Sequence, residues 1–213
     1  MNPNQNLRQQ AKEHTRVALK KSALKLYSQQ GASGVSMNKV AKGAGIAQPS
    51  FYNHFASLDA LFEELRNELT QRYMAPLRMA VIDILGNFDQ LSDLQLKQLN
   101  QQFLRIIFDA AFENITLFQR LIEDRPRFSA SNTGLASIVI EIQNEWAQAF
   151  NQGLTLSGRN IAQSTLYLFL DSTAAMIHEL ILGCHSGRYS QEQAIETLSN
   201  NIGKMFDELL SNN

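Results

Sequence analysis

Residues 36–55 (SMNKVAKGAGIAQPSFYNHF) contain two short helix patterns that are joined by a tight turn. Ser36 stands where its side chain can accept a hydrogen bond from an unpaired backbone amide of the first helix. Gly45 supplies the positive φ that a tight turn between two helices requires. Pro49 is tolerated in the first turn of the second helix, because its missing amide hydrogen would be unpaired there anyway. This layout predicts a helix-turn-helix, whose second helix is the one that enters a major groove of DNA.

The second helix carries short polar and aromatic side chains and contains no acidic residue. Gln48 can pair with an adenine edge through two hydrogen bonds, and Pro49 can pack on a thymine methyl group. Ser50 is short enough to let the helix sit deep in a groove. Phe51 and Phe55 are instead expected to hold this helix on its neighbours. The pattern therefore favours a surface that reads base edges.

The charge of the chain is divided unevenly along its length. Residues 1–56 hold eight lysines and arginines against one acid, Glu13, although the whole chain has a net charge of −1. In the first helix, four basic residues recur every four positions from Arg8 to Lys20. A positive N-terminal end on an acidic remainder suits a protein that presents one end to a polyanion.

This stretch closely resembles the DNA-binding signature of the TetR family of bacterial transcriptional regulators. The resemblance covers about residues 12–65 and includes the Phe51-Tyr52-x-His54-Phe55 core and the following Leu61-Phe62. It implies that Tyr52 and His54 bind phosphates and fix the register of the second helix. One position departs from the family pattern: Leu58 stands where the family usually has a phosphate-binding lysine.

Together, the resemblance and the residue chemistry predict a set of DNA contacts. Short polar, basic or aromatic side chains in and just before the helix-turn-helix make up this set: Lys20, Ser36, Asn38, Lys39, Gln48, Pro49, Ser50, Tyr52, Asn53 and His54. For Lys20 and Lys39 the expected partner is a phosphate.

The sequence predicts a helical structure for the whole chain. It has only four prolines, and no alternating pattern of apolar and polar residues persists. We expect an all-α fold with about nine helices: a three-helix DNA-binding domain over residues 1–56, followed by a larger effector-binding and dimerisation domain over residues 57–213. The expected helices are 8–30, 37–44, 48–54, 58–86, 91–112, 115–124, 132–153, 160–186 and 190–211. Pro76 should kink or weaken the long fourth helix.

The last two predicted helices carry apolar residues at alternating spacings of three and four. The predicted interface residues are Leu166, Leu170, Ile177, Ile195, Leu198, Ile202, Met205 and Leu209. Two such helices can form half of a four-helix bundle with a second subunit, which predicts a homodimer. Packing within one chain is the alternative, because the stripes alone do not show which helix they meet.

The middle of the chain is rich in large apolar side chains, which can either fill a core or line a cavity for a lipophilic effector. The predicted ligand-binding residues are Phe108, Phe112, Trp146, Phe150 and Tyr167. The segment 114–125 and the sequence Pro49-Ser50-Phe51-Tyr52 resemble the corresponding sequences of regulators of unsaturated fatty acid synthesis. This resemblance implies an acyl chain or its thioester as a candidate ligand.

The sequence gives little support to other classes of protein. The sequence has no phosphate loop, nucleophile elbow or zinc-protease motif, so we expect neither an enzyme nor a cofactor. The spacing of His178, Cys184 and His185 does not favour a metal site. We expect no membrane-spanning segment, no secretory signal and a cytoplasmic protein.

The resulting prediction is a dimeric regulator that binds a palindromic double-stranded DNA operator and is released as a repressor by a small molecule. An activator of the same family is one alternative. The other is a helical lipid-binding or interaction protein that does not use its helix-turn-helix.

Overall fold

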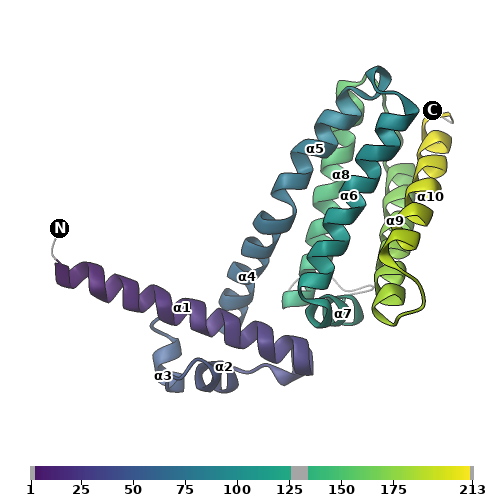
Figure 1. The fold of residues 1–213 in the computed structure, drawn as a ribbon. Helices are drawn as coiled ribbons and strands as arrows, with labels where there is room; N and C mark the ends of the chain where they lie inside the picture. The colour runs from purple at the N-terminus through teal and green to yellow at the C-terminus, as the bar shows by residue number, and fades with distance from the viewer. Residues whose placement is uncertain (1–2, 126–133, 212–213) are drawn as a thin grey trace. The chain divides into compact units, whose positions relative to one another are not determined.

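A computed structural model describes residues 3–125 and 134–211, and these residues form ten α-helices and three short 3-10 helices (Figure 1). The all-helical prediction is confirmed. The α-helices are α1 (Pro3–Gln30), α2 (Met37–Gly43), α3 (Gln48–Phe51), α4 (Leu58–Tyr73), α5 (Ala75–Gly86), α6 (Asp93–Glu113), α7 (Ile115–Glu123), α8 (Ile138–Leu156), α9 (Gln163–His185) and α10 (Gln191–Ser211). The 3-10 helices are η1 (Ala32–Gly34), η2 (Phe88–Gln90) and η3 (Leu135–Ser137).

The chain divides into two compact units. The first unit holds residues 1–69 and 116–138, and the second holds residues 70–115 and 139–213. The first is larger than the predicted DNA-binding domain, which ended at residue 56. It also takes in most of α4, together with α7 and η3, because apolar side chains of these helices complete its core.

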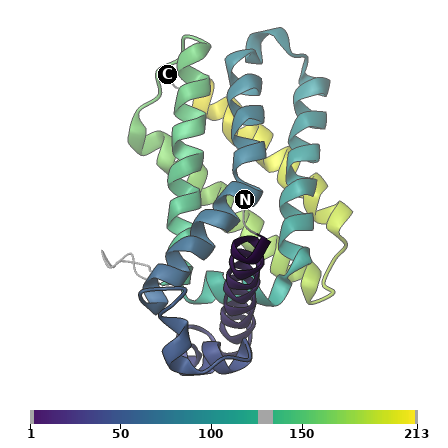
Figure 2. The same ribbon diagram turned by 90° about the vertical axis from the view of Figure 1, so that its left-hand side faces the viewer.

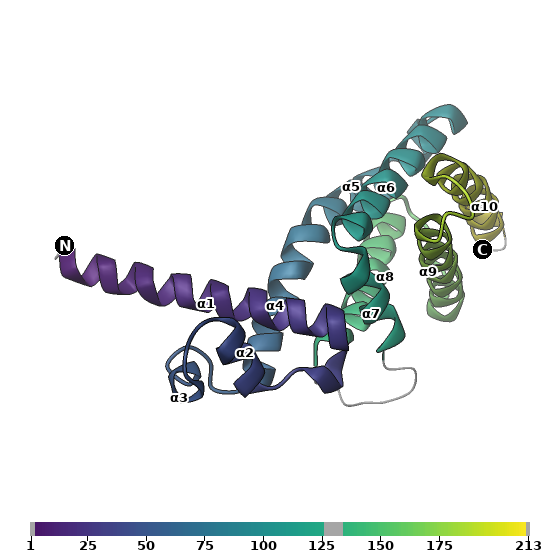
Figure 3. The same ribbon diagram turned by 60° about the horizontal axis from the view of Figure 1, so that its bottom comes forward.

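In the first unit, α1 passes over α2 and α3 (Figures 1 and 3). Its core draws on α1 to α4, and also on α7 and η3. The buried members are Leu19, Ala23, Tyr27, Val35, Val40, Ala41, Phe51, Phe55, Leu61, Phe62, Leu65, Leu117 and Leu135. A polar contact joins the same segments, since the Asp124 carboxylate accepts a hydrogen bond from the backbone N–H of Ala32 at 3.1 Å.

The predicted helix over residues 58–86 is two helices in the structure. Helix α4 ends at Tyr73, and α5 begins at Ala75 with Pro76 in its first turn. Proline has no amide hydrogen to donate within a helix, but it is well suited to a helix start. The expected effect of Pro76 is therefore confirmed, and it amounts to a break in the helix.

In the second unit, α5, α6 and α8 run side by side along much of their length (Figures 1 and 2). Helices α9 and α10 form a pair next to each other (Figure 3). Polar contacts tie neighbouring helices together: Arg78 pairs with Glu145 at 3.0 Å, and the Asn100 amide donates to the Ser199 carbonyl at 3.3 Å. The start of α6 is fixed by a reciprocal capping box between Ser92 and Gln95.

The core of the second unit combines buried aliphatic residues with aromatic rings. Its buried members are Val81, Ile82, Leu85, Ala149, Leu154, Ile161, Leu166, Phe169 and Leu209. Partly buried rings surround them, and successive centroids lie close: Phe150 and Phe169 at 5.7 Å, and Phe169 and Phe206 at 5.9 Å. The predicted helix over residues 132–153 appears as η3 and α8, and its first two residues lie outside the described part of the chain.

Candidate nucleic-acid interface

Helix α2 begins at the predicted residue, Met37, and ends at Gly43, one residue before the predicted end. The Ser36 side chain accepts a hydrogen bond from the Lys39 backbone N–H at 3.4 Å, which caps the first turn. At the other end, Gly45 has a φ of 76°, and the Ile46 amide returns to the Ala41 carbonyl at 3.0 Å. A residue in this left-handed conformation followed by a backward hydrogen bond is the usual helix C-terminal turn. The turn sets the direction of the segment that comes after it.

The recognition segment, residues 48–54, combines a short helix with a turn. Helix α3 ends at Phe51, earlier than predicted, and the next amides bond only three residues back: Asn53 to Ser50 at 3.2 Å and His54 to Phe51 at 2.9 Å. Phe51 is fully buried, and its ring lies 5.8 Å from that of Phe55. These two rings hold the recognition segment on the core of the first unit, as the sequence predicted.

The side chains of this segment divide into an exposed and a half-buried set. Gln48, Pro49, Tyr52 and Asn53 are exposed, and Tyr52 keeps 55% of its surface open to solvent even though it is aromatic. Ser50 and His54 are half-buried. The exposed face thus presents amide and phenol groups without a carboxylate, which is the chemistry needed to meet base edges and phosphates.

Ser36, Asn38 and Lys39 lie around the start of α2, and all three are exposed. The Lys39 ammonium donates to the Gly34 carbonyl at 2.9 Å and to the Gln30 side chain at 3.2 Å. An ammonium has three donors, so these contacts leave one for an incoming phosphate oxygen. Together with the first amides of α2, the three side chains form a patch suited to the DNA backbone.

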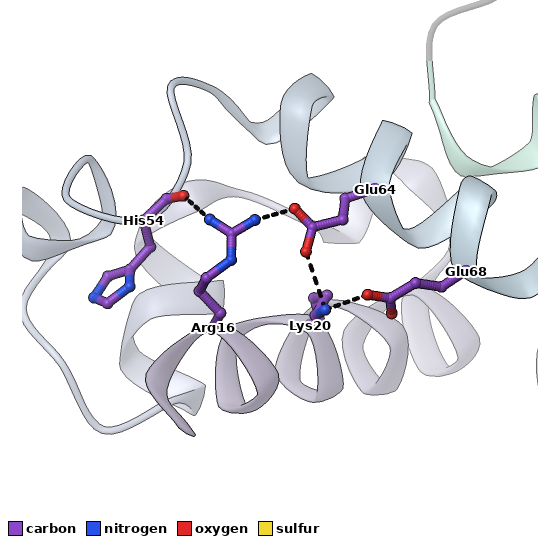
Figure 4. Close-up of polar contacts among 5 residues, drawn as sticks. All are labelled: Arg16, Lys20, His54, Glu64 and Glu68. Atoms are coloured by element: carbon purple, nitrogen blue, oxygen red, sulfur yellow. Dashed lines mark hydrogen bonds and ion pairs between the residues drawn. The ribbon is translucent and has the colours of Figure 1, made fainter. Parts of the chain in front are cut away.

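Lys20 is placed differently from the prediction. It is buried, with 8% of its surface exposed, and its ammonium pairs with Glu64 at 3.0 Å and with Glu68 (Figure 4). Burial alone lowers the pKa of Lys20, but the hydrogen bonds to Glu68 and Glu64 outweigh this effect, and the net shift is upward. The structure thus surrounds this charge with two carboxylates of α4, whose negative charge opposes the approach of a phosphate.

Arg16 belongs to the same group of contacts. One guanidinium nitrogen donates to the His54 carbonyl and a second pairs with Glu64 (Figure 4). The guanidinium carbon lies 4.3 Å from the centroid of the Phe55 ring. In the sequence, Arg16 stands out only as part of a basic row. The overlooked signal was a matching acidic pair, because Glu64 and Glu68 are spaced by four residues, just as Arg16 and Lys20 are.

His54 lies at the end of the recognition segment near two positive charges. Burial lowers the pKa of His54, and Lys12 and Arg16 lower it further. Since an ordinary histidine already titrates below neutrality, His54 is a neutral imidazole at pH 7 in the DNA-free protein. It is therefore suited to forming a hydrogen bond with a phosphate rather than contributing a full charge.

The five predicted ligand-binding residues have different surroundings in the structure. Trp146 and Phe150 pack against the core of the second unit, and Trp146 meets Phe103 with a centroid distance of 5.1 Å. Phe108 is fully buried, and Phe112 lies against His185. Tyr167 is 39% exposed on α9, so it is placed to meet solvent or a partner rather than an enclosed ligand.

The predicted interface residues are mostly covered by their own chain. Leu166, Ile195, Leu198 and Leu209 are buried, while Leu170, Ile202 and Met205 pack against the core of the second unit and Ile177 is half-buried. The alternative of packing within one chain accounts for most of this stripe. A different residue, Leu168, is 70% exposed on α9.

Helix α9 is more apolar than the sequence-based expectation allowed. Residues 163–185 are long and apolar enough to cross a membrane by length and composition, with a mean hydropathy of 1.3 over the best window and 22% of that window buried. The expectation of no membrane-spanning segment stays a prediction. Length and composition alone are weak evidence for a membrane span, because core helices of other proteins meet the same criterion. Helix α9 therefore has apolar surface left over in a single chain.

Comparison with known proteins identifies the first unit. Residues 20–65 match the family model described as bacterial regulatory proteins of the tetR family. Over 58 residues the chain is 41% identical to the HTH-type transcriptional regulator AcrR of Shigella flexneri, which is 27% of this chain. The alignment spans about a quarter of that relative's length, 26%.

Solved structures match over most of the chain. A TetR-family regulator of Streptomyces coelicolor has a TM-score of 0.62 at 19% identity, covering 94% of this chain and 84% of that one. A TetR-family regulator of Marinobacter aquaeolei VT8 has a TM-score of 0.60 at 17% identity, covering 92% of this chain and 97% of that one. A protein described as a candidate fatty acid metabolism regulator of Clostridium perfringens has a TM-score of 0.59 at 14% identity, covering 87% and 96%. At these identities the likeness is one of fold.

Proposed function

Because this chain belongs to the TetR family, as its DNA-binding domain shows, we propose that the whole protein is a DNA-binding transcriptional regulator. It acts in the cytoplasm as a homodimer on a palindromic operator, and a small molecule releases it as a repressor. The observation that carries this proposal is the recognition segment, with exposed Gln48, Tyr52 and Asn53 held on a core through Phe51.

On DNA, the recognition segment enters the major groove. Gln48 reads an adenine edge and Pro49 packs on a thymine methyl, while Ser50 allows close approach. Phosphate contacts from Tyr52, Asn53 and His54 on one side hold the segment in register. The patch formed by Ser36, Asn38 and Lys39 binds the backbone on the other side. Lys20 has no part in this, because Glu64 and Glu68 neutralise it.

Two copies are needed to read a palindrome. Their recognition segments have to lie about 34 Å apart, one turn of DNA, or a multiple of it. The apolar surface that α9 leaves open, centred on Leu168 and Tyr167, supports a homodimer through this helix. A second copy covers the same patch on both sides, as a twofold interface requires.

The effector is proposed to bind in the second unit and to act through α4, which carries the chain from the first unit into the second. A ligand that favours another position of α4 changes the spacing of the two recognition segments, and affinity for one half-site is lost. The aromatic rings of the second unit support a lipophilic effector, and an acyl thioester or fatty acid is the candidate.

Trp146 provides a direct test of the effector, because it is the only tryptophan and lies 5.1 Å from Phe103. Titration with oleoyl-coenzyme A or oleate is expected to change Trp146 fluorescence and to weaken operator binding by about 5- to 150-fold, the usual range of coupling between two sites. A Trp146→Phe variant should lose the optical signal and keep the DNA response. If neither ligand alters fluorescence or DNA binding, the effector belongs to another chemical class.

The DNA-reading assignment is tested by two substitutions with different signatures. Gln48→Ala should cost about 1–3 kcal/mol at the affected base pair and relax the sequence preference there. Lys39→Ala should weaken binding to all duplexes alike and lower the salt slope by about one. Titrations of each variant against a duplex selected from a random pool, at several salt concentrations, measure both effects. If both variants bound DNA with the affinity, sequence preference and salt dependence of the wild type, the assignment of Gln48 and Lys39 to DNA contacts would be contradicted.

An activator of the same family would bind DNA in the same way, and a reporter gene placed behind the selected site separates it from a repressor. A lipid-binding or interaction protein without a DNA role is separated by a gel shift. That alternative does not account for the exposed basic residues of positions 1–56, which include Arg8, Lys12, Lys21, Lys25 and Lys42.

A further inference from the structure

Arg16 directs its side chain at the protein rather than at solvent. Its guanidinium packs on the ring of Phe55. Two of its nitrogens contact the His54 carbonyl and the Glu64 carboxylate (Figure 4). The side chain keeps 24% of its surface exposed. Although Arg16 is one of the basic residues of α1, two of its donors are therefore engaged within the first unit.

The carbonyl that Arg16 binds stands at the end of the recognition segment. The last carbonyls of a helix have no partner within the helix and need a donor from elsewhere. Here the segment ends in a turn, and its amides bond only three residues back, as in the 2.9 Å bond from His54 to Phe51. Arg16 supplies the donor for the His54 carbonyl and so ties down the end that carries Tyr52 and Asn53.

The guanidinium itself is held from the other side. Glu64 pairs with Arg16 and also with Lys20 at 3.0 Å, and Lys20 pairs in turn with Glu68 (Figure 4). The contacts form one row from the His54 carbonyl to Glu68, and all of it lies within the first unit. A planar guanidinium can serve a carbonyl and a carboxylate at once, whereas the ammonium of a lysine lacks that fixed fork.

We propose that Arg16 is a positioning residue for DNA reading: it sets the place of the recognition segment through the His54 carbonyl and does not itself bind DNA. This inference rests on the proposed function. It predicts that loss of Arg16 reduces discrimination between sequences, and that it leaves the number of phosphate contacts unchanged.

The experiment compares four variants on two duplexes, one selected from a random pool by the wild-type protein and one of scrambled sequence. Arg16→Met removes the carbonyl contact and the ion pair, whereas Glu64→Gln removes the ion pair and keeps the carbonyl contact. Arg16→Lys keeps the charge without the fork. Lys25→Met removes an exposed charge from the same helix and serves as the control.

Arg16→Met is expected to lower the preference for the selected duplex by about tenfold, the loss of one base-edge contact, with an unchanged salt slope. Arg16→Lys should be intermediate, and Glu64→Gln and Lys25→Met should keep the preference. If Arg16→Met lowers the salt slope by about one, Arg16 binds phosphate and the proposal is wrong. An equal loss in Glu64→Gln would also overturn it, because the ion pair alone would then be responsible.

Hydrogen exchange gives a second measurement that needs no DNA. In Arg16→Lys, the amides of residues 53–55 should exchange faster than in the wild type, while those of α2 stay unchanged. If the exchange rates of residues 53–55 and of α2 changed equally, a positioning role for Arg16 would be contradicted. This measurement on Arg16→Lys tests the proposal even if Arg16→Met does not fold. If the wild-type protein selects no DNA sequence at all, the proposed function is wrong. The hydrogen-exchange measurement then still tests whether Arg16 holds the recognition segment through the His54 carbonyl.

Discussion

Leu168→Glu is expected to convert the proposed homodimer into a folded monomer. Leu168 is 70% exposed in a single chain, so a glutamate at this position leaves the chain's own core intact. In a closed interface through α9, the same carboxylate would be buried without a partner, at a cost of several kcal/mol. A monomer reaches only one half-site, and its affinity for the operator should fall toward the non-specific level, by about 10³-fold or more.

Sedimentation velocity and operator titration measure the two effects. Leu94→Glu is the matched control, because Leu94 is similarly exposed, at 65%, but lies on α6. It should leave both the assembly and the DNA affinity unchanged. A Leu168→Glu protein that remains a dimer would place the interface elsewhere. Ile202→Glu is a poorer test, since Ile202 packs against its own chain's core and the change would also unfold the protein.

Phe51→Ala is expected to unfold the first unit. Phe51 is fully buried at the centre of its core, and removing a buried phenylalanine side chain costs about 3–5 kcal/mol. This is a large fraction of the roughly 5–15 kcal/mol that stabilises a whole domain. The second unit has its own core and should stay folded, so the protein should remain a dimer that has lost DNA binding.

Denaturant unfolding followed by circular dichroism should then show a partial loss of helix before the main transition. Tyr52→Ala is the matched control, because the neighbouring aromatic residue is exposed. It should keep the fold and weaken DNA binding only. A Phe51→Ala protein that unfolds in one transition and still binds its operator would contradict the placement of Phe51 in a separate core.

The helix-turn-helix could be predicted because its signals are local. The cap at Ser36, the turn at Gly45 and the buried Phe51 each depend on residues a few positions apart, and the structure confirms all three. The pairing of Lys20 with two carboxylates could not be predicted, for the opposite reason. Its partner Glu64 is 44 residues away in sequence, and a charge pattern on one helix does not show which helix will face it.

The body of the protein illustrates the same limit. The apolar stripes of the last two helices were recognised, but the structure buries Leu198 and Leu209 within one chain. Periodicity reports that a face is apolar and does not report what covers it. The aromatic residues were likewise recognised as apolar. Their positions depend on how the helices pack, and Tyr167 accordingly lies on the surface instead of among the others.

The DNA-reading function is tested most simply by letting the wild-type protein select duplexes from a random pool. We expect enrichment of a palindrome whose two half-sites have centres about 34 Å apart or a multiple of it, with affinity that falls steeply as salt rises. Gln48→Ala should change the selected sequence at one position in each half-site. A pool that shows no enrichment after repeated rounds, with equally weak binding to every duplex, would contradict the conclusion that this chain reads DNA.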